Sequence, residues 1–103
     1  MSGSRSLAEY VADQLAPLGE VTLHRYFGGW ALRCHGIQFA IVMDTLYLRV
    51  DGEARSSYES AGSTPFTYHA AGRTVVVHAY YSAPAQAIDD RTELCALARA
   101  ALA

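Results

Sequence analysis

Residues 30–50 read WALRCHGIQFAIVMDTLYLRV, and this stretch decides the fold. Apolar side chains alternate with others along most of it, which is the period of a β-strand rather than that of a helix. Two short turn signals, His35-Gly36 and Asp44-Thr45, interrupt the alternation and suit two-residue hairpin loops. The stretch therefore predicts consecutive antiparallel strands, within a meander that starts near Val21.

The two turns also predict which residues lie opposite one another. The first turn gives the pairs Cys34 with Ile37, Leu32 with Phe39 and Trp30 with Ile41. The second gives Met43 with Leu46, Ile41 with Leu48 and Phe39 with Val50. Because paired residues of an antiparallel ladder share a face, we expect these apolar residues on one face. The other face then carries Ala31, Arg33, Gln38, Ala40, Val42, Tyr47 and Arg49.

Three segments around these strands have the spacing of helices with one apolar side. The first begins with a capping-box pattern at residues 6–9 and closes near Pro17. Its apolar stripe is Leu7, Tyr10, Val11, Leu15 and Leu18. The second runs from an Asp51 cap to about Ala61, and the third follows a cap at Asp90.

A further hairpin is expected between the second and third helices. A turn at Ala71-Gly72 aligns Phe66 with Val77 and Tyr68 with Val75. The opposite face of this hairpin would show Thr67, His69, Val76, His78 and Tyr80. Together these elements predict one α+β domain over residues 1–103, a two-layer structure with an antiparallel sheet and three helices in the order α-β(3-4)-α-β2-α.

Composition limits the classes of function. The 103 residues carry 8 basic and 10 acidic side chains, for a net charge of −2. A concentrated basic surface is needed for tight binding to phosphates, so independent high-affinity DNA binding is not favoured. The chain has neither an apolar run of about 18 residues nor a signal-peptide pattern, which predicts a cytoplasmic protein.

The residues that carry chemistry do not form a known catalytic or metal-binding pattern. The four histidines and two cysteines show no Cys-x-x-Cys or His-x-x-x-His spacing, so we expect no metal and no cofactor. Cys34 and Cys95 are expected to be reduced and buried. Phe27-Gly28-Gly29 lacks the spacing of a phosphate-binding loop and predicts a sharp bend into the Trp30 strand. These observations favour a protein that is not an enzyme.

The outer face of the predicted sheet is the candidate for binding a partner. Five of its residues would share a surface if all helices lie on the other side: Arg33, Tyr47, Arg49, His78 and Tyr80. Arginine and tyrosine provide planar hydrogen bonding and rigid contact area, and both are enriched at interface hot spots. An ordinary solvated sheet face remains the alternative interpretation.

Several segments, in this order, resemble the N-terminal domain of the TfoX/Sxy competence regulators. They are residues 27–32, 36–42, 46–51, 64–68, 80–84 and the helix from Asp90 to Leu102. The resemblance covers nearly the whole chain. The sequence differs at Arg49, where a lysine is common, at Ala31, where a glycine is common, and at Asp44-Thr45, where the usual turn is longer. The second domain of the full-length regulators is expected to be absent.

The resemblance implies a bacterial regulatory domain that works through protein contacts. Its partner would be the transcription machinery or the cyclic-AMP receptor protein. Two other functions stay open, direct nucleic-acid binding and the binding of a small ligand at the Phe27-Gly28-Gly29 bend. A homodimer is also expected if a sheet face or edge is left uncovered.

Overall fold

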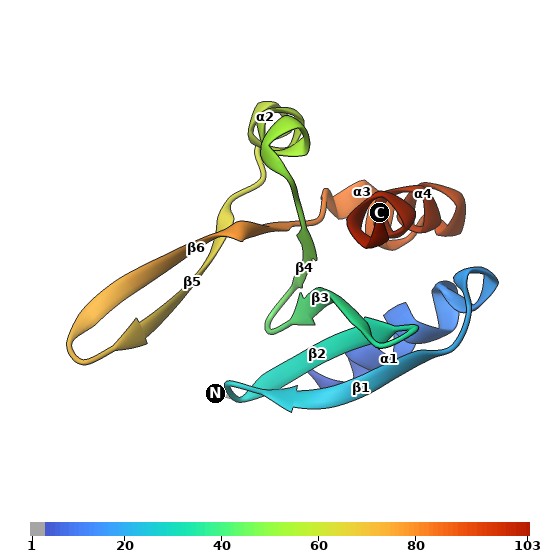
Figure 1. Ribbon diagram of the computed structural model, residues 1–103, viewed down its shortest axis with the longest axis horizontal. Helices are drawn as coiled ribbons and strands as arrows, with labels where there is room; N and C mark the ends of the chain where they lie inside the picture. The colour runs from blue at the N-terminus through green and yellow to red at the C-terminus, as the bar shows by residue number, and fades with distance from the viewer. Residues whose placement is uncertain (1–3) are drawn as a thin grey trace.

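The computed structural model describes residues 4–103 and shows a six-stranded antiparallel sheet with helices packed against it (Figure 1). The spatial order of the strands is β1-β2-β3-β4-β6-β5. The strands are β1 Val21–Tyr26, β2 Gly29–Cys34, β3 Ile37–Val42, β4 Leu46–Arg49, β5 Pro65–Ala70 and β6 Arg73–Ser82. The helices are α1 Arg5–Gln14, the 3₁₀ helix η1 Ala16–Leu18, α2 Gly52–Ser60, α3 Ala85–Ile88 and α4 Arg91–Leu102. The α+β class is confirmed, while η1 and the short helix α3 were not expected.

Three hairpin turns have the backbone that a two-residue loop requires. In Phe27-Gly28, His35-Gly36 and Ala71-Gly72 both residues have positive φ, between 46° and 81°. This is the type I′ geometry, whose twist matches that of the flanking strands, and glycine occupies the second position each time. The predicted turns at His35-Gly36 and Ala71-Gly72 are confirmed, as is the predicted bend at Phe27-Gly28.

The register of β2 with β3 differs from the sequence prediction. Cys34 pairs with Ile37 as expected, but a β-bulge follows, so that Leu32 pairs with Ala40 and not with Phe39. Phe39 is the extra residue of the bulge. In the same way Trp30 pairs with Val42 rather than with Ile41. A bulge allows the side chains of two consecutive residues to point to the same face of the sheet. Here Phe39 and Ala40 both point into the helix-side core.

The connection from β3 to β4 is also longer than expected. Val42 pairs with Leu46, which leaves residues 43–45 in the loop instead of Asp44-Thr45 alone. The predicted pairs of Met43 with Leu46, Ile41 with Leu48 and Phe39 with Val50 are therefore wrong. Ala40 pairs with Leu48, and Ile41 pairs with Tyr47. Ile41 consequently lies on the face opposite the helices, while Ala40 and Val42 face the helices, the reverse of the prediction.

The helix caps explain where the helices begin. Ser4 caps α1 by accepting a hydrogen bond from the Leu7 amide, so the helix starts before the predicted cap at Ser6. Asp51 and Asp90 cap α2 and α4 as predicted, accepting from the amides of Ala54 and Glu93.

One member of the predicted apolar stripe of α1 lies outside the core. Tyr10 is exposed, and its hydroxyl donates to the carbonyl of Ile88 in α3 at 3.2 Å. Ala8 and Val11 fill the buried side of α1, together with Leu15 directly after the helix.

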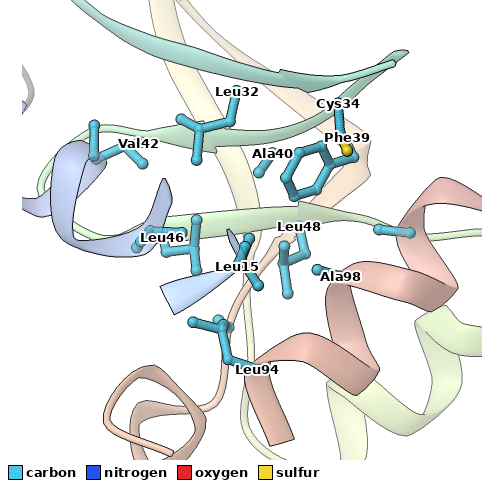
Figure 2. Packing of buried hydrophobic residues seen from close by; sticks show 14 of the residues in the cluster. Leu15, Leu32, Cys34, Phe39, Ala40, Val42, Leu46, Leu48, Leu94 and Ala98 are labelled. Carbon is cyan, nitrogen blue, oxygen red and sulfur yellow. The ribbon is translucent and has the colours of Figure 1, made fainter. Parts of the chain in front are cut away.

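The main core lies between the sheet and helices α1 and α4. Figure 2 shows side chains from β2, β3 and β4 meeting Leu15 at the end of α1 and Leu94 and Ala98 of α4. Its fully buried large residues include Leu32, Phe39, Leu46 and Leu48. A smaller cluster, Val50, Tyr58 and Tyr81, joins α2 to β6 and to the residue that follows β4. Within residues 4–103, no helix is long and apolar enough to cross a membrane.

Candidate interaction surface

The sheet curls so that its two edges approach each other at one end. Strands β1 and β5 occupy opposite edges of the sheet. Nevertheless Phe27, in the turn after β1, stacks on Tyr68 of β5 with ring centroids 5.3 Å apart and an angle of 11° between the rings. A flat six-stranded sheet would hold these edges far apart, because neighbouring strands are about 4.8 Å from one another. The face opposite the helices is therefore concave.

Five aromatic side chains line this concave face and contact one another in sequence. We call them the aromatic row: Tyr26, Phe27, Tyr68, Phe66 and Tyr47. Successive ring centroids are 4.8, 5.3, 6.0 and 5.3 Å apart, within the range of favourable aromatic contacts. The row thus connects the β1–β2 turn, through β5, to β4.

Two apolar residues are buried on this same face. Ile41 is fully buried and Ala31 is 1% exposed, yet neither belongs to the helix-side core. They pair with each other, and Ile41 also pairs with Tyr47 of the aromatic row. The curl of the sheet therefore encloses a second, smaller apolar layer on a side that the sequence predicted to be open.

Phe27 is the exposed end of the aromatic row. Its side chain is 68% exposed, the highest value among the exposed large hydrophobic residues of the described chain. Its own φ of 46° is strained for a residue with a side chain, and Gly28 supplies the second positive φ of the turn. A Cβ at Gly29 would collide with the Val42 carbonyl oxygen and the Met43 sulfur, so only glycine allows β2 to approach the β3–β4 loop here.

Tyr47 and Tyr80, both predicted for the outer face, are half-buried. Tyr47 packs edge-to-face on Phe66, and burial, followed by the negative charge of Asp44, raises the pKa of its phenol. The Tyr80 hydroxyl accepts a hydrogen bond from Gln38 Nε2 at 3.3 Å. Burial raises the pKa of Tyr80, although the Gln38 bond and the Arg49 charge lower it in part.

Arg49 has a structural role. Its Nε and Nη2 donate to the carbonyl oxygen of Ala101 at 3.1 and 2.7 Å, at the end of α4, and its Nη1 donates to the Gln38 carbonyl at 3.4 Å. The last carbonyls of a helix lack partners within the helix, and a positive charge is favourable there. The guanidinium group of Arg49 thus holds α4 against the sheet.

The remaining members of the predicted surface are exposed but lie on different parts of the sheet. Arg33 pairs with Thr22 on β1 and Gln38 on β3. His78 lies in the segment of β6 where the register with β5 shifts, between the pair Phe66–Val77 and the pair Pro65–Tyr81. The predicted pairs of Phe66 with Val77 and Tyr68 with Val75 are confirmed. The shift breaks the simple alternation that had placed His78 and Tyr80 together.

Of the aromatic row, the sequence predicted only Tyr47 for the binding surface. It predicted a bend at Phe27 and strand positions for Phe66 and Tyr68. The sequence signal for Phe66 and Tyr68 is their spacing of two positions within β5, which indicates a single face. Nothing local in the sequence indicates that the far edge of the sheet curls back onto that face.

A cleft of about 450 Å³ adjoins the surface on the side of Tyr47. It opens between the β3–β4 loop, the α2–β5 connection and the start of α3, and its lining is mainly polar, with Asp44, Thr64, Ser82 and Gln86. The Phe27-Gly28-Gly29 bend does not line it. Among residues 4–103 there is no group of three or more side chains suited to hold a metal ion, and both cysteines are buried and unpaired.

Several arginines are engaged in structural contacts. The guanidinium groups of Arg5 and Arg25 each lie 5.0 Å from the centre of the Trp30 ring. Arg91 donates to the carbonyls of Asp13 and Gln14 at the end of α1, as Arg49 does for α4. Binding to a phosphate backbone requires basic side chains gathered on one surface. Four of the eight basic side chains are instead held in structural contacts at three places: Arg5 and Arg25 at Trp30, Arg49 at the end of α4 and Arg91 at the end of α1.

Comparison with known proteins identifies the family. The family model of the TfoX N-terminal domain matches residues 13–103. The chain belongs to this family. The match extends from the last two residues of α1 to the end of α4, so the TfoX-type domain contains the entire sheet and with it the aromatic row. A search of curated proteins finds no match.

Proposed function

We propose that this TfoX-type domain is a non-enzymatic, cytoplasmic protein-interaction domain that serves transcription regulation. The observation that carries the proposal is Phe27, an aromatic ring that is 68% exposed and yet held in place by its stack on Tyr68. A rigid, exposed aromatic side chain gives a partner a large apolar contact without a large loss of conformational entropy on binding.

Other features of the concave face support this role. The aromatic row behind Phe27 fixes the position of its ring, and the exposed guanidinium group of Arg33 lies on the same sheet. The resemblance to competence regulators makes the cyclic-AMP receptor protein the first partner to test. The scattered arginines and the net charge of −2 favour a protein partner over nucleic acid.

The experiment is a titration of the fluorescently labelled domain with purified cyclic-AMP receptor protein, followed by anisotropy. Phe27→Ala is expected to weaken binding by about thirtyfold or more, because truncation of a hot-spot residue costs about 2 kcal/mol or more. Val76→Ala is the matched control, because Val76 is also an exposed apolar residue, 44% exposed, but lies on β6 outside the aromatic row.

Two results would count against the proposal. Equal binding by the native domain and Phe27→Ala would show that the concave face is not the contact surface. Failure of the native domain to bind the receptor protein would remove this partner and with it the regulatory role proposed here.

A further inference from the structure

The strand β5 forms one edge of the sheet and has β6 as its neighbour on one side only. The two-residue turn Ala71-Gly72 makes Ala70 and Arg73 a hydrogen-bonded pair. Since the direction of backbone hydrogen bonds alternates along a strand, the N–H and C=O groups of Thr67 and His69 point away from β6. Both residues are exposed. The edge therefore offers two donors and two acceptors in one line.

Between Thr67 and His69 this edge lacks the usual protection against pairing with another strand. Natural edge strands carry charged side chains, prolines or bulges that prevent such pairing. Residues 61–88 contain a single charged side chain, Arg73, and β5 itself contains none. Pro65 and the register shift between Pro65 and Phe66 both lie at the start of β5, before the exposed donors. The opposite edge, β1, carries Arg25 and packs against α1.

We propose that two copies of this chain associate by pairing their β5 strands antiparallel about a two-fold axis. In the register that uses both exposed donors, Thr67 of each copy lies opposite His69 of the other and exchanges both backbone hydrogen bonds with it. Tyr68 of each copy then lies opposite its counterpart across the axis. Association through β5 does not require the transcriptional partner proposed above.

The chemistry of β5 favours a second copy as the occupant. An uncharged strand meets its own copy without repulsion between like charges. A register shifted toward the start of β5 loses a hydrogen bond, because Pro65 has no N–H. A register shifted the other way places His69 at the axis and brings Thr67 of each copy opposite the Ala71-Gly72 turn of the other. The central pair also continues the aromatic row, since Tyr68 already stacks on Phe27. The contact is short, so the dimer is expected to be weak and dependent on concentration.

The test is sedimentation equilibrium over a concentration range from about 10 µM to about 1 mM, where weak association is detectable. The native chain is expected to change from its mass of 11.2 kDa toward twice that value. Thr67→Pro removes an outward N–H and keeps the hydrogen bonds between β5 and β6. Thr67→Lys places a positive charge on the edge. Both variants are expected to stay monomeric. Thr22→Lys, on the other edge strand, is the matched control and should still dimerise.

Amide hydrogen exchange provides a second readout that needs no variant. The amides of Thr67 and His69 should exchange at least tenfold more slowly at the high concentration. The amide of Leu23 on β1 should not change; it points away from β2, because Tyr26 and Gly29 form the hydrogen-bonded pair next to the turn and the direction alternates from there. A constant mass of 11.2 kDa across the range would overturn the proposal. So would slowing at Leu23, or a series of species larger than a dimer, since β1–β5 pairing gives open assemblies. Thr67→Lys and the exchange data decide the question if Thr67→Pro fails to fold.

Discussion

Replacement of Arg49 by methionine should destabilise the domain substantially, although Arg49 lies on the face predicted to bind partners. Methionine keeps most of the apolar stem and removes the guanidinium group. The carbonyl oxygen of Ala101, at the end of α4, then loses the two donors that lie 3.1 and 2.7 Å from it. Ala101 is only 5% exposed. A hydrogen bond from a charged donor contributes about 1.5–3 kcal/mol, and a favourable charge at a helix end adds about 0.3–1 kcal/mol.

We therefore expect Arg49→Met to lower the free energy of unfolding by about 2–3 kcal/mol, which corresponds to a Tm lower by roughly 10–20 °C for a domain of this size. Urea unfolding followed by far-ultraviolet circular dichroism measures the change. Arg49→Lys should cost less, since one donor remains. Arg99→Met is the control, because Arg99 is exposed in the last turn of the same helix and its loss removes only a charge near the helix end.

A change of less than about 0.5 kcal/mol in the free energy of unfolding of Arg49→Met, the range of ordinary surface substitutions, would refute the structural role of Arg49. Equal effects of Arg49→Met and Arg99→Met would refute it as well. In either case the Arg49 guanidinium would be available for a partner, as the sequence suggested.

Three further predictions concern other parts of the structure. Gly29→Ala should lower the free energy of unfolding by about 1–3 kcal/mol through collision with Val42 and Met43, whereas Gly52→Ala, with open space around it, should be neutral or stabilising; thermal denaturation compares the two. Ile41→Ala should cost about 2–5 kcal/mol although Ile41 lies outside the helix-side core, and a cost near zero in urea unfolding would mean that the concave face is open to water. The hydrogen bond from Tyr81 to Glu59 at 2.5 Å raises the pKa of the Tyr81 phenol. The unfolded chain then releases this proton at a lower pH than the folded chain. The stability that this bond contributes is therefore complete below pH ~10 and is lost as the pH rises above it. Above pH ~10 the urea midpoint should decline less steeply for Tyr81→Phe than for the native protein, and an equal decline would contradict this.

The β5–β6 hairpin shows which information is local enough to be predicted from sequence. Its turn residues, Ala71-Gly72, adopt positive φ as expected, and the predicted pairs of Phe66 with Val77 and Tyr68 with Val75 are present. The caps at Asp51 and Asp90 were predicted for the same reason, since each depends on residues within one helical turn.

The β3 strand shows why alternation alone was insufficient. The bulge at Phe39 and the longer loop at residues 43–45 each shift the register by one residue, in opposite directions. The two errors cancel at β4, so Leu46 and Leu48 face the helices as predicted, but residues 40–42 lie on the wrong faces in the prediction. A run of consecutive apolar residues such as residues 39–42 fits either face equally well, and only the packing on both sides of the sheet selects the bulge.

The candidate surface could be predicted only in part for a similar reason. The partner contacts proposed for Arg33, Tyr47, Arg49, His78 and Tyr80 remain predictions. The aromatic row depends on contact between the two edges of the sheet, Phe27 with Tyr68, across 41 positions of sequence. Such a contact is set by the curl of all six strands and leaves no signal in a window of sequence. Arg49 bonds to α4 across 52 positions, which was equally invisible.

The most direct test of the concave sheet face is a nuclear Overhauser measurement on the isotopically labelled domain. Stacked rings with centroids 5.3 Å apart should give strong cross-peaks between the ring protons of Phe27 and Tyr68, and the methyl groups of Ile41 should show cross-peaks to the aromatic row. If Phe27 shows contacts only within its own turn and the Ile41 methyl groups show none to aromatic rings, the sheet does not curl and the proposed surface is absent.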